Sequence, residues 1–371
     1  MEIKRSVIWS NRSGENVTWF HPKCCKLKNG ELLMLLQSIS GSDFYGPVCE
    51  SFSNDAWHWS DPAEITGLGL RELDEGITED ICDVVPNWHA ASDTVLAIGH
   101  NVYNKNGAHF NFISDKDARS KQPLAVVPYW SVRNAEGAWV KVRQKLEIPG
   151  FEECTLYTCG CTQWFFRGKN EVLIPFFYGY KDSPRIKVCT VKFFYDGTRL
   201  EFIEKGEALE HPGEYAFVEP SMIEAGDRVI MTLRSDDKRA YVTKSSDALH
   251  WEQPKAWQFD DGEVLTIFST QQHLLRCGGR NWLFYTRETE YNKGVKRFRT
   301  PMFIAEINDD LELIRESENI VFPMIDEEGK GAGMGNFHVT QLSDTEALVT
   351  VGEERSYDHF WGDTLEAYIK F

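Results

Sequence analysis

Residues 53–59 read SNDAWHW and residues 245–251 read SSDALHW, so both stretches follow the pattern S-x-D-A-x-H-W. In each copy the Asp carboxylate can accept backbone N–H groups of its own turn, the Ser hydroxyl can cap that turn, and the Trp can pack beneath a sheet. Two tight turns of one design, far apart in the chain, indicate a repeated β unit. We interpret both as structural turns at sheet edges, without a catalytic role.

Short strands separated by turns recur along the whole chain. Apolar or alternating runs follow turn-forming Gly, Asn or Asp residues, as in 31–37 (ELLMLLQ), 171–177 (EVLIPFF), 228–233 (RVIMTL) and 347–351 (ALVTV). These units begin near residues 30, 93, 169, 227, 280 and 345, and a propeller blade takes roughly 40–50 residues. The spacing predicts an all-β propeller of six or seven blades, and residues 1–371 as a single domain.

Composition and charge narrow the class of ligand. The chain has 40 Lys and Arg against 57 Asp and Glu, a net charge of −17, which disfavours binding to a phosphate backbone and predicts no nucleic-acid partner. Aromatic residues make up 13% of the chain, which suits both β cores and surfaces that face sugars. An anionic substrate would require a local cluster of Arg.

Targeting and metal signals are not apparent in the sequence. The N-terminus has no apolar run typical of a signal peptide, and no stretch is long and apolar enough to span a membrane. The nine Cys are scattered, and Cys159-Gly-Cys161 does not have the spacing of a zinc motif. We therefore expect a cytoplasmic protein with no membrane partner, no metal and no cofactor, leaving open calcium in a central channel. The oligomeric state is not indicated.

Several further segments carry a family resemblance: 20–22 (FHP), 99–103 (GHNVY), 218–221 (VEPS), 269–273 (STQQH) and 335–337 (GNF). The two S-x-D-A-x-H-W turns resemble the Asp-box, or BNR repeat, of sialidase-like propellers, with Ala where Gly is usual. Together the segments resemble glycoside hydrolase family 145 and the related rhamnose–glucuronate lyases, and more distantly the ulvan lyases. The resemblance implies a seven-bladed β-propeller that cleaves uronate-containing glycans, with a six-bladed propeller of the sialidase type as the alternative.

Removal of the C5 proton of a uronate needs a base, an acid for the leaving oxygen and a cation for the carboxylate. The resemblance implies that His100, at the end of an apolar run, is the base, because imidazole titrates near neutral pH. It implies Tyr178 as the acid, with Tyr180 an equal rival by position. The cation falls at Lys192, although a Lys cannot form the Arg fork. A structural role is the competing interpretation for each residue.

An Arg cluster of the kind needed for an anionic sugar follows in the next segments. Glu219 and Arg234 stand in an E-P-S … L-R arrangement similar to one in sialidases, and Arg287 and Arg299 add cations. Glu219 and Glu353 are the carboxylates available for hydrolysis by an acid–base pair. No Tyr stands near residue 337 where sialidases place their nucleophile, which argues against sialic acid cleavage by the usual mechanism. Interblade salt bridges are the competing interpretation of the Arg residues.

Polar residues near the ends of predicted strands are candidates for bonding sugar hydroxyls. Residues 271–273 (QQH) form an unusual polar triplet, and alternation along a strand points Gln271 and His273 to the same side. The candidate substrate-binding residues of this kind are Gln163, Gln272, His273 and His338. Satisfaction of buried backbone groups is the competing interpretation.

Three functions are compatible with the sequence. The first is a carbohydrate-active enzyme that cleaves uronate- and rhamnose-containing oligosaccharides by β-elimination with His100 as base. The second is an exo-acting glycoside hydrolase, sialidase-like or rhamnosidase-like, on terminal sugars. The third is a propeller that binds glycans without turnover, because fold alone does not fix function. All three expect an anionic oligosaccharide as the partner.

Overall fold

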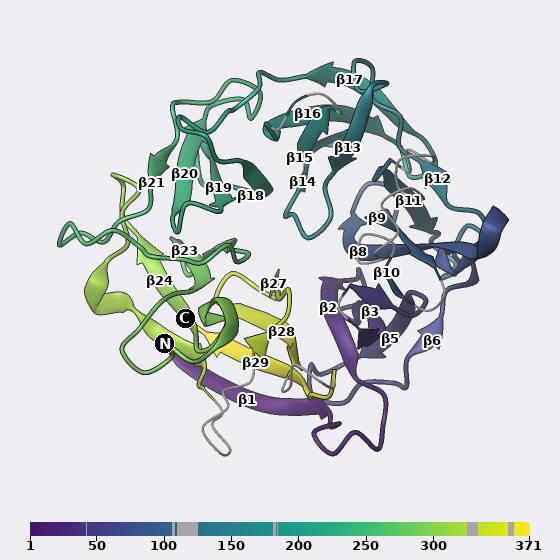
Figure 1. Ribbon diagram of the computed structural model, residues 1–371, viewed down its shortest axis with the longest axis horizontal. Helices are drawn as coiled ribbons and strands as arrows, with labels where there is room; N and C mark the ends of the chain where they lie inside the picture. The colour runs from purple at the N-terminus through teal and green to yellow at the C-terminus, as the bar shows by residue number, and fades with distance from the viewer. Residues whose placement is uncertain are drawn as a thin grey trace.

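The computed structural model describes residues 1–371 except for 42, 106–107, 110–124, 181–182, 184, 325–332 and 355–359 (Figure 1). Strands make up 54% of the chain and helices 3%, which confirms the all-β prediction. The described strands form six antiparallel sheets that follow one another around a common centre. The protein is therefore a six-bladed β-propeller. No helix in the described residues is long and apolar enough to cross a membrane.

The six blades follow the chain, each built outward from an inner strand. The first contains β2 (Trp19–Lys26), β3 (Leu32–Gly41), β4 (Phe44–Tyr45), β5 (Cys49–Ser53) and β6 (Ala63–Glu64). The second contains β7 (Arg71–Glu72), β8 (Ile77–His89), β9 (Thr94–Lys105), β10 (Ala108–His109), β11 (Pro128–Arg133) and β12 (Gln144–Lys145). The third contains β13 (Cys154–Thr158), β14 (Phe165–Arg167), β15 (Glu171–Tyr180), β16 (Lys187–Tyr195) and β17 (Leu200–Lys205).

The remaining three blades complete the ring. The fourth contains β18 (Phe217–Glu224), β19 (Val229–Ser235), β20 (Ala240–Ser245) and β21 (Lys255–Ala256). The fifth contains β22 (His273–Cys277), β23 (Arg280–Thr286), β24 (Met302–Ile307) and β25 (Asn319–Phe322). The sixth contains β26 (Gly333–Met334), β27 (His338–Gln341), β28 (Glu346–Glu354), β29 (Thr364–Lys370) and β1 (Glu2–Trp9). Short 3₁₀ turns are η1 (Thr66–Leu68), η2 (Asp74–Gly76), η4 (Lys296–Phe298) and η5 (Arg315–Ser317).

The structure corrects the expectation of seven blades. The six turn–strand units recognised in the sequence are the second strands of the six blades, namely β3, β9, β15, β19, β23 and β28. The seventh blade came from the family resemblance, and the usual blade length of roughly 40–50 residues allowed it, whereas 371 residues over six blades give about 62 each. The extra length lies partly in long strands such as β8, which has 13 residues.

The two ends of the chain close the ring within one sheet. β1 pairs antiparallel with β29, from Glu2 opposite Lys370 to Ser6 opposite Glu366, and the two strands lie side by side in Figure 1. Arg5 also donates from Nε to the carbonyl of Val321 in the fifth blade at 2.6 Å. The pairing of β1 with β29 ties the start of the chain to its last blade and so closes the ring between the first and last blades. This closure holds the hub in a fixed geometry.

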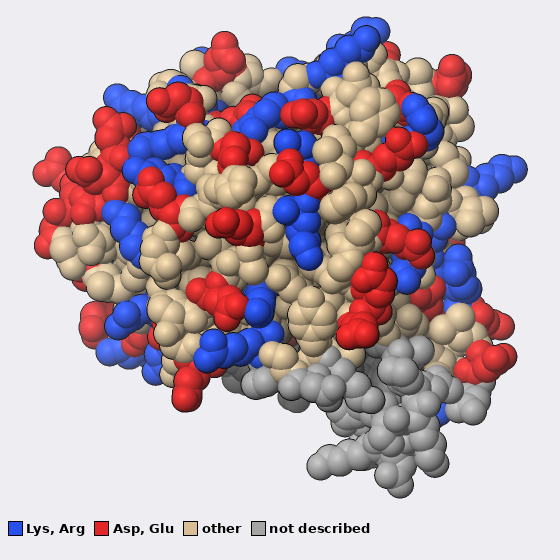
Figure 2. All heavy atoms as spheres, turned by 90° about the horizontal axis from the view of Figure 1, so that it is seen from above, with Lys and Arg blue, Asp and Glu red and all other residues tan. Residues whose placement is uncertain are grey.

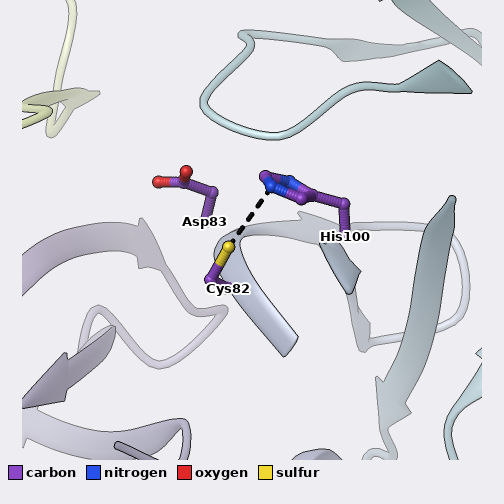
Figure 3. A group of neighbouring side chains, drawn as sticks. All are labelled: Cys82, Asp83 and His100. Atoms are coloured by element: carbon purple, nitrogen blue, oxygen red, sulfur yellow. Dashed lines mark hydrogen bonds between the residues drawn. The ribbon is translucent and has the colours of Figure 1, made fainter. Parts of the chain in front are cut away.

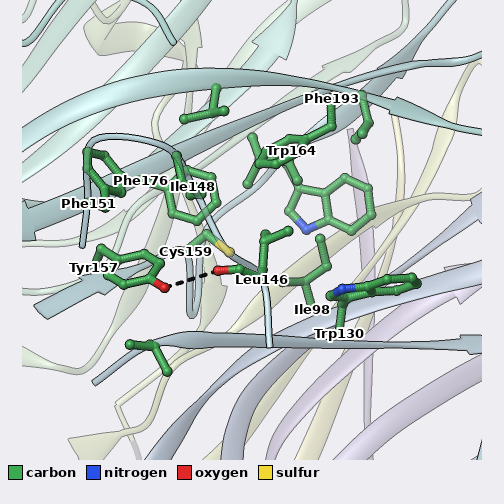
Figure 4. Close-up of a cluster of buried hydrophobic side chains, with 14 of the residues drawn as sticks. Ile98, Trp130, Leu146, Ile148, Phe151, Tyr157, Cys159, Trp164, Phe176 and Phe193 are labelled. Atoms are coloured by element: carbon green, nitrogen blue, oxygen red, sulfur yellow. Dashed lines mark hydrogen bonds between the residues drawn. The ribbon is translucent and has the colours of Figure 1, made fainter. Parts of the chain in front are cut away.

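The apolar core lies between neighbouring sheets. In the cluster between the second and third blades, Trp130, Trp164, Phe176 and Phe193 pack together and are almost fully buried (Figure 4). Burial of one such aromatic side chain contributes roughly 1.5–3 kcal/mol. These contacts come from alternate residues along each strand. A polar residue at a buried position of an inner strand is therefore an exception.

Both S-x-D-A-x-H-W segments form the turns predicted for them. Asp55 Oδ1 accepts the backbone N–H groups of Trp57 and His58, each at 2.9 Å. In the second copy Asp247 Oδ1 accepts the corresponding groups of Leu249 and His250 at 2.8 and 2.9 Å. The two turns hold one loop of the first blade and one of the fourth.

Surface charge is distributed rather than gathered. Figure 2 shows Lys and Arg interspersed with Asp and Glu over the face it presents. Pairs such as Arg199 with Asp196, at 2.7 Å, and Arg167 with Glu224, at 2.7 Å, contribute to this pattern. This face therefore shows no cluster of one charge sign among its described residues, and the hub is the place where such a cluster is expected.

Candidate active site

A repeated backbone distortion turns polar side chains toward the hub. His21, Asp83, Cys161, Glu219 and Ser269 belong to successive blades, and all have positive φ angles between 46° and 62°. In β2, β8 and β18 the distortion coincides with a shift in strand register. Positive φ is uncommon for residues other than Gly and clusters at functional sites. These five positions therefore mark the hub as the candidate site.

One side of the hub holds buried charges from the first and second blades. Lys23 Nζ lies 2.7 Å from Asp83 Oδ1, and Lys23 has no exposed surface. His21 Nδ1 lies 3.0 Å from the same oxygen, off the direction of a hydrogen bond. Burial alone would raise the pKa of Asp83, but His21 and Lys23 lower it well below its usual value. The Asp83 carboxylate is therefore ionised at neutral pH.

His100 is fixed between two neighbours in the second and third blades. Its Nε2 lies 3.3 Å from Cys82 Sγ, as Figure 3 shows. Its Nδ1 is buried without a hydrogen-bond partner, and a Cβ on Gly160 would lie 2.1 Å from it. Burial lowers the pKa of His100, and the charge of Asp83 opposes the change. The imidazole is therefore neutral near pH 7 and tightly held.

The opposite side of the hub is built around Arg234 in the fourth blade. Arg234 Nη1 donates to Glu219 Oε1 at 2.5 Å, and its Nε and Nη2 donate to Ser269 Oγ at 3.1 and 3.0 Å. Ser269 Oγ in turn donates to Asp236. Glu219 Oε2 is buried and has no hydrogen-bond partner among the described residues. Glu219 thus keeps one carboxylate oxygen for a ligand.

Arg299 adds a second guanidinium beside this group. It donates from Nη1 to the carbonyl of Met334 at 3.1 Å, and no salt bridge is found for it among the described residues. Burial lowers the pKa of Arg299, and the nearby cations Arg234 and Arg297 lower it further, while Glu219 opposes them. Arg234 and Arg299 therefore bring two guanidinium groups to the hub of a chain whose net charge is −17.

Cys161 joins the two sides of the hub. Asn336 Nδ2 lies 2.7 Å from its sulfur. Burial raises the pKa of the Cys161 thiol well above its usual value, and the carboxylates of Asp83 and Glu219 act in the same direction. Asp83 on one side of the hub and Glu219 on the other therefore both lie close enough to Cys161 to affect its pKa. The two sides of the hub form a single site.

Four residues predicted from the sequence meet at this hub: His100, Glu219, Arg234 and Arg299. Glu219 and Arg234 lie near strand ends, Arg299 lies in a loop, and His100 lies in the middle of β9. Glu353, proposed as the partner of Glu219 for hydrolysis, is instead bound to Arg12 at 3.0 Å and is 2% exposed. The Glu353 carboxylate is therefore bound to a partner within the protein.

Four polar candidates make hydrogen bonds within the protein: Gln163, His273 and His338 bond backbone groups, and Gln272 bonds the Thr232 side chain. Gln163 accepts from the N–H of Leu274 at 2.6 Å and donates to its carbonyl at 2.8 Å. His273 contacts Ser221 Oγ and the carbonyl of Phe337 at 3.1 and 2.9 Å. Gln272 and His338 are likewise engaged, with Thr232 Oγ1 and the Cys24 N–H respectively. Their contacts link blades, and sugar binding by them stays a prediction.

Three other candidates make their described contacts away from the hub cluster. Tyr178 is 5% exposed and stacks on Phe151 with ring centroids 4.5 Å apart. Lys192 lies 3.3 Å from Glu204 on the outermost strand of the third blade. Arg287 makes two bonds to Glu318, at 2.8 and 2.7 Å. The structure does not bring these three side chains to His100, and their proposed roles stay predictions.

Several hub residues were not found by sequence reasoning. Lys23 and Asp83 are buried charged residues within β2 and β8, strands that also carry other polar residues, so the sequence offered little signal for them. The Tyr45 ring lies tilted against His21, with ring centroids 4.9 Å apart, and its hydroxyl donates to Asp43 Oδ1 at 3.2 Å. Asp43 is exposed and has a positive φ of 53°. It joins Asp83, Glu219 and Asp236 as a carboxylate associated with the hub.

Comparison with known proteins supports the fold. No protein-family model matches the sequence, and no curated protein matches it. A protein of unknown function from Dyadobacter fermentans is similar in structure, with a TM-score of 0.69, 14% identity, and coverage of 100% of this chain and 99% of that one. The Hadza microbial sialidase Hz136 matches with a TM-score of 0.65, 9% identity and coverage of 99% and 68%.

The sialidase of Trypanosoma rangeli is also similar, with a TM-score of 0.63, 12% identity and 99% of this chain covered. The chain spans 59% of that sialidase's length. These similarities show that the chain shares the β-propeller fold of these sialidases. At these identities the likeness concerns the fold, and the chemistry has to be argued from the hub.

Proposed function

We propose that the protein is a carbohydrate-active enzyme, a glycoside hydrolase that acts on a sugar carrying a carboxylate. The observation that supports this most directly is the Arg234–Glu219 pair next to Arg299. Glu219 pairs with Arg234, whereas Arg299 has no salt bridge among the described residues and is available to an anionic ligand. Arg binds carboxylates through short, directional hydrogen bonds. The sialidase-like fold of the chain agrees with such a ligand.

Hydrolysis of a glycosidic bond commonly uses two carboxyl groups. Glu219 supplies one, because its Oε2 is buried without a partner while Oε1 is held by Arg234. We assign Glu219 one of two roles. It acts either as the nucleophile that attacks the anomeric carbon or as the base that activates the attacking water. Asp43, exposed beside the Tyr45 hydroxyl, is the proposed donor to the leaving oxygen. Asp83 is unsuited to proton donation because its pKa is lowered.

β-Elimination at a uronate is a second candidate that uses the same anion site. The lowered pKa of His100 keeps its imidazole neutral, as a base requires. The contacts with Cys82 and Gly160 restrict access to both ring nitrogens. For this reason hydrolysis is the preferred proposal, and elimination is retained as its alternative.

One assay separates the candidates. The purified protein is incubated with oligosaccharides that end in a carboxylate-bearing sugar, among them rhamnose–glucuronate disaccharides, and with their carboxyl-reduced counterparts. Hydrolysis releases reducing sugar without ultraviolet absorbance, whereas elimination creates an absorbing unsaturated uronate. We expect reducing sugar from the acidic substrates only. Binding without turnover across the panel would reject both enzymatic proposals.

A further inference from the structure

The hub contains a group of metal-binding side chains that the proposed hydrolysis does not use. Cys82 and Asp83 lie in β8, and His100 lies opposite Cys82 in β9. Side chains of consecutive strand residues normally point to opposite faces. The register shift between Cys82 and Val85, with φ of 53° at Asp83, breaks this alternation. Figure 3 shows the Cys82 sulfur between the Asp83 carboxylate, to its left, and the His100 ring, to its right.

The spacing of the three groups suits a small cation. A sulfur, a carboxylate oxygen and an imidazole nitrogen lie within 4.8 Å of one another, and the sulfur–nitrogen distance is 3.3 Å. Zinc–ligand bonds of about 2.3 Å to sulfur and 2.0–2.1 Å to nitrogen place these atoms about 3.6 Å apart in a tetrahedron. The Cys82–His100 pair is therefore almost at the required separation before any ion enters.

The surrounding residues hold the ligands in place. The His100 ring lies against Gly160, where any side chain would collide with it, and its Nδ1 is buried without a partner. Lys23 and His21 both contact Oδ1 of Asp83, so an ion would use Oδ2. The Lys23 ammonium lowers the attraction for a metal, and loss of the Cys82 proton on binding supplies a compensating negative charge.

We propose that Cys82, Asp83 and His100 form a binding site for one thiophilic divalent cation of the Zn²⁺ class. Thiolate, imidazole and carboxylate together suit Zn²⁺ better than Ca²⁺ or Mg²⁺, which prefer oxygen ligands. Three protein ligands leave the fourth position for a water molecule or a ligand hydroxyl. The site is independent of the proposed hydrolysis, in which none of the three residues acts on the substrate.

The test uses Co²⁺ as a spectroscopic substitute for Zn²⁺ on chelator-treated protein. We expect one equivalent of Co²⁺ to produce a thiolate-to-metal charge-transfer band that Zn²⁺ abolishes. Cys82→Ser should remove the band, and His100→Gln should weaken Co²⁺ binding at least about 10-fold. Cys277→Ser, in the fifth blade, keeps its donor to backbone carbonyls and serves as the matched control.

Gly160→Ala keeps all three ligands and displaces the His100 ring, so it should also weaken binding. Near-ultraviolet circular dichroism establishes that each variant is folded. Because His100→Gln and Gly160→Ala keep the Cys82 thiol, their Co²⁺ binding tests the site independently of Cys82→Ser. No thiolate band in the wild-type protein at millimolar Co²⁺, or a band that persists in folded Cys82→Ser, would overturn the proposal. Because the readout is an absorption band, it is separate from success or failure of the hydrolase assay.

Discussion

Glu219 and Arg234 form a 2.5 Å ion pair across two adjacent strands of the fourth blade, and the pair leaves one Glu219 oxygen without a partner. A carboxylate held by one oxygen and free at the other has a fixed direction of approach. Arg234 is itself held by Ser269, so its guanidinium cannot rotate away. Glu219 and Arg234 therefore form one rigid unit that contains both a base and an anion-binding group.

Glu219→Gln tests the catalytic part of this unit. The amide can still accept from Arg234 but cannot act as base or nucleophile, so kcat should fall about 100- to 10,000-fold with little change in KM. Glu224→Gln is the matched control, since Glu224 lies in the same strand and pairs with Arg167 at the surface. Steady-state kinetics on the acidic oligosaccharide measures both. A Glu219→Gln enzyme with near wild-type kcat would exclude the assignment.

Arg299→Gln tests recognition of the anion. Loss of a charged hydrogen bond to the substrate carboxylate should raise KM for the acidic sugar about 10- to 100-fold. The carboxyl-reduced substrate should be unaffected. Arg287→Gln is the comparison, because Arg287 is bound to Glu318 and should change stability rather than KM. Equal effects on acidic and reduced substrates would contradict a role for Arg299 in carboxylate binding.

Lys23→Met tests the buried pair of Lys23 with Asp83. Removal of the ammonium leaves an unpaired carboxylate in the interior, so the free energy of unfolding should fall by about 3–5 kcal/mol. The double variant Lys23→Met with Asp83→Asn removes both charges and should recover most of that loss. Urea unfolding of the single and double variants measures the coupling. Additive losses in the double variant would show that the two charges do not stabilise one another.

Much of the propeller could be predicted from local sequence signals. The two turns at Asp55 and Asp247 form the expected hydrogen bonds because every group they need lies within seven consecutive residues. The six turn–strand units gave the correct number of blades, and the seventh was added from the family resemblance. Loop and strand lengths in each blade depend on packing between sheets, which local patterns do not contain.

The hub was predicted in part, and the missing residues share a physical reason. Arg234 lies near the end of β19 and Arg299 lies in a loop, where a polar residue attracts notice, whereas His100, in the middle of β9, was found through the family resemblance. Lys23 and Asp83 lie within β2 and β8, where alternation assigns them to a sheet face. The register shifts that turn them to the hub arise from the backbone conformation, which has no signature in a single sequence.

Asp80→Asn tests a buried carboxyl outside the hub. Burial raises the pKa of Asp80 to about 7, because its Oδ2 has no hydrogen-bond partner, although the Ile81 N–H and the charge of Arg143 act in the opposite direction. The folded state therefore binds a proton more tightly than the unfolded state, and Asp80 costs stability as the pH rises from about 4 to about 7. Asp80→Asn should remove this cost, stabilising the protein at pH 8 by up to about 4 kcal/mol and having little effect at pH 4. Asp196→Asn is the contrasting control: hydrogen bonds lower the pKa of Asp196, so its stabilising charge is present at both pH 4 and pH 8, and its loss should destabilise the protein at both pH values. Urea unfolding at both pH values decides the matter, and an Asp80→Asn effect independent of pH would refute the assignment.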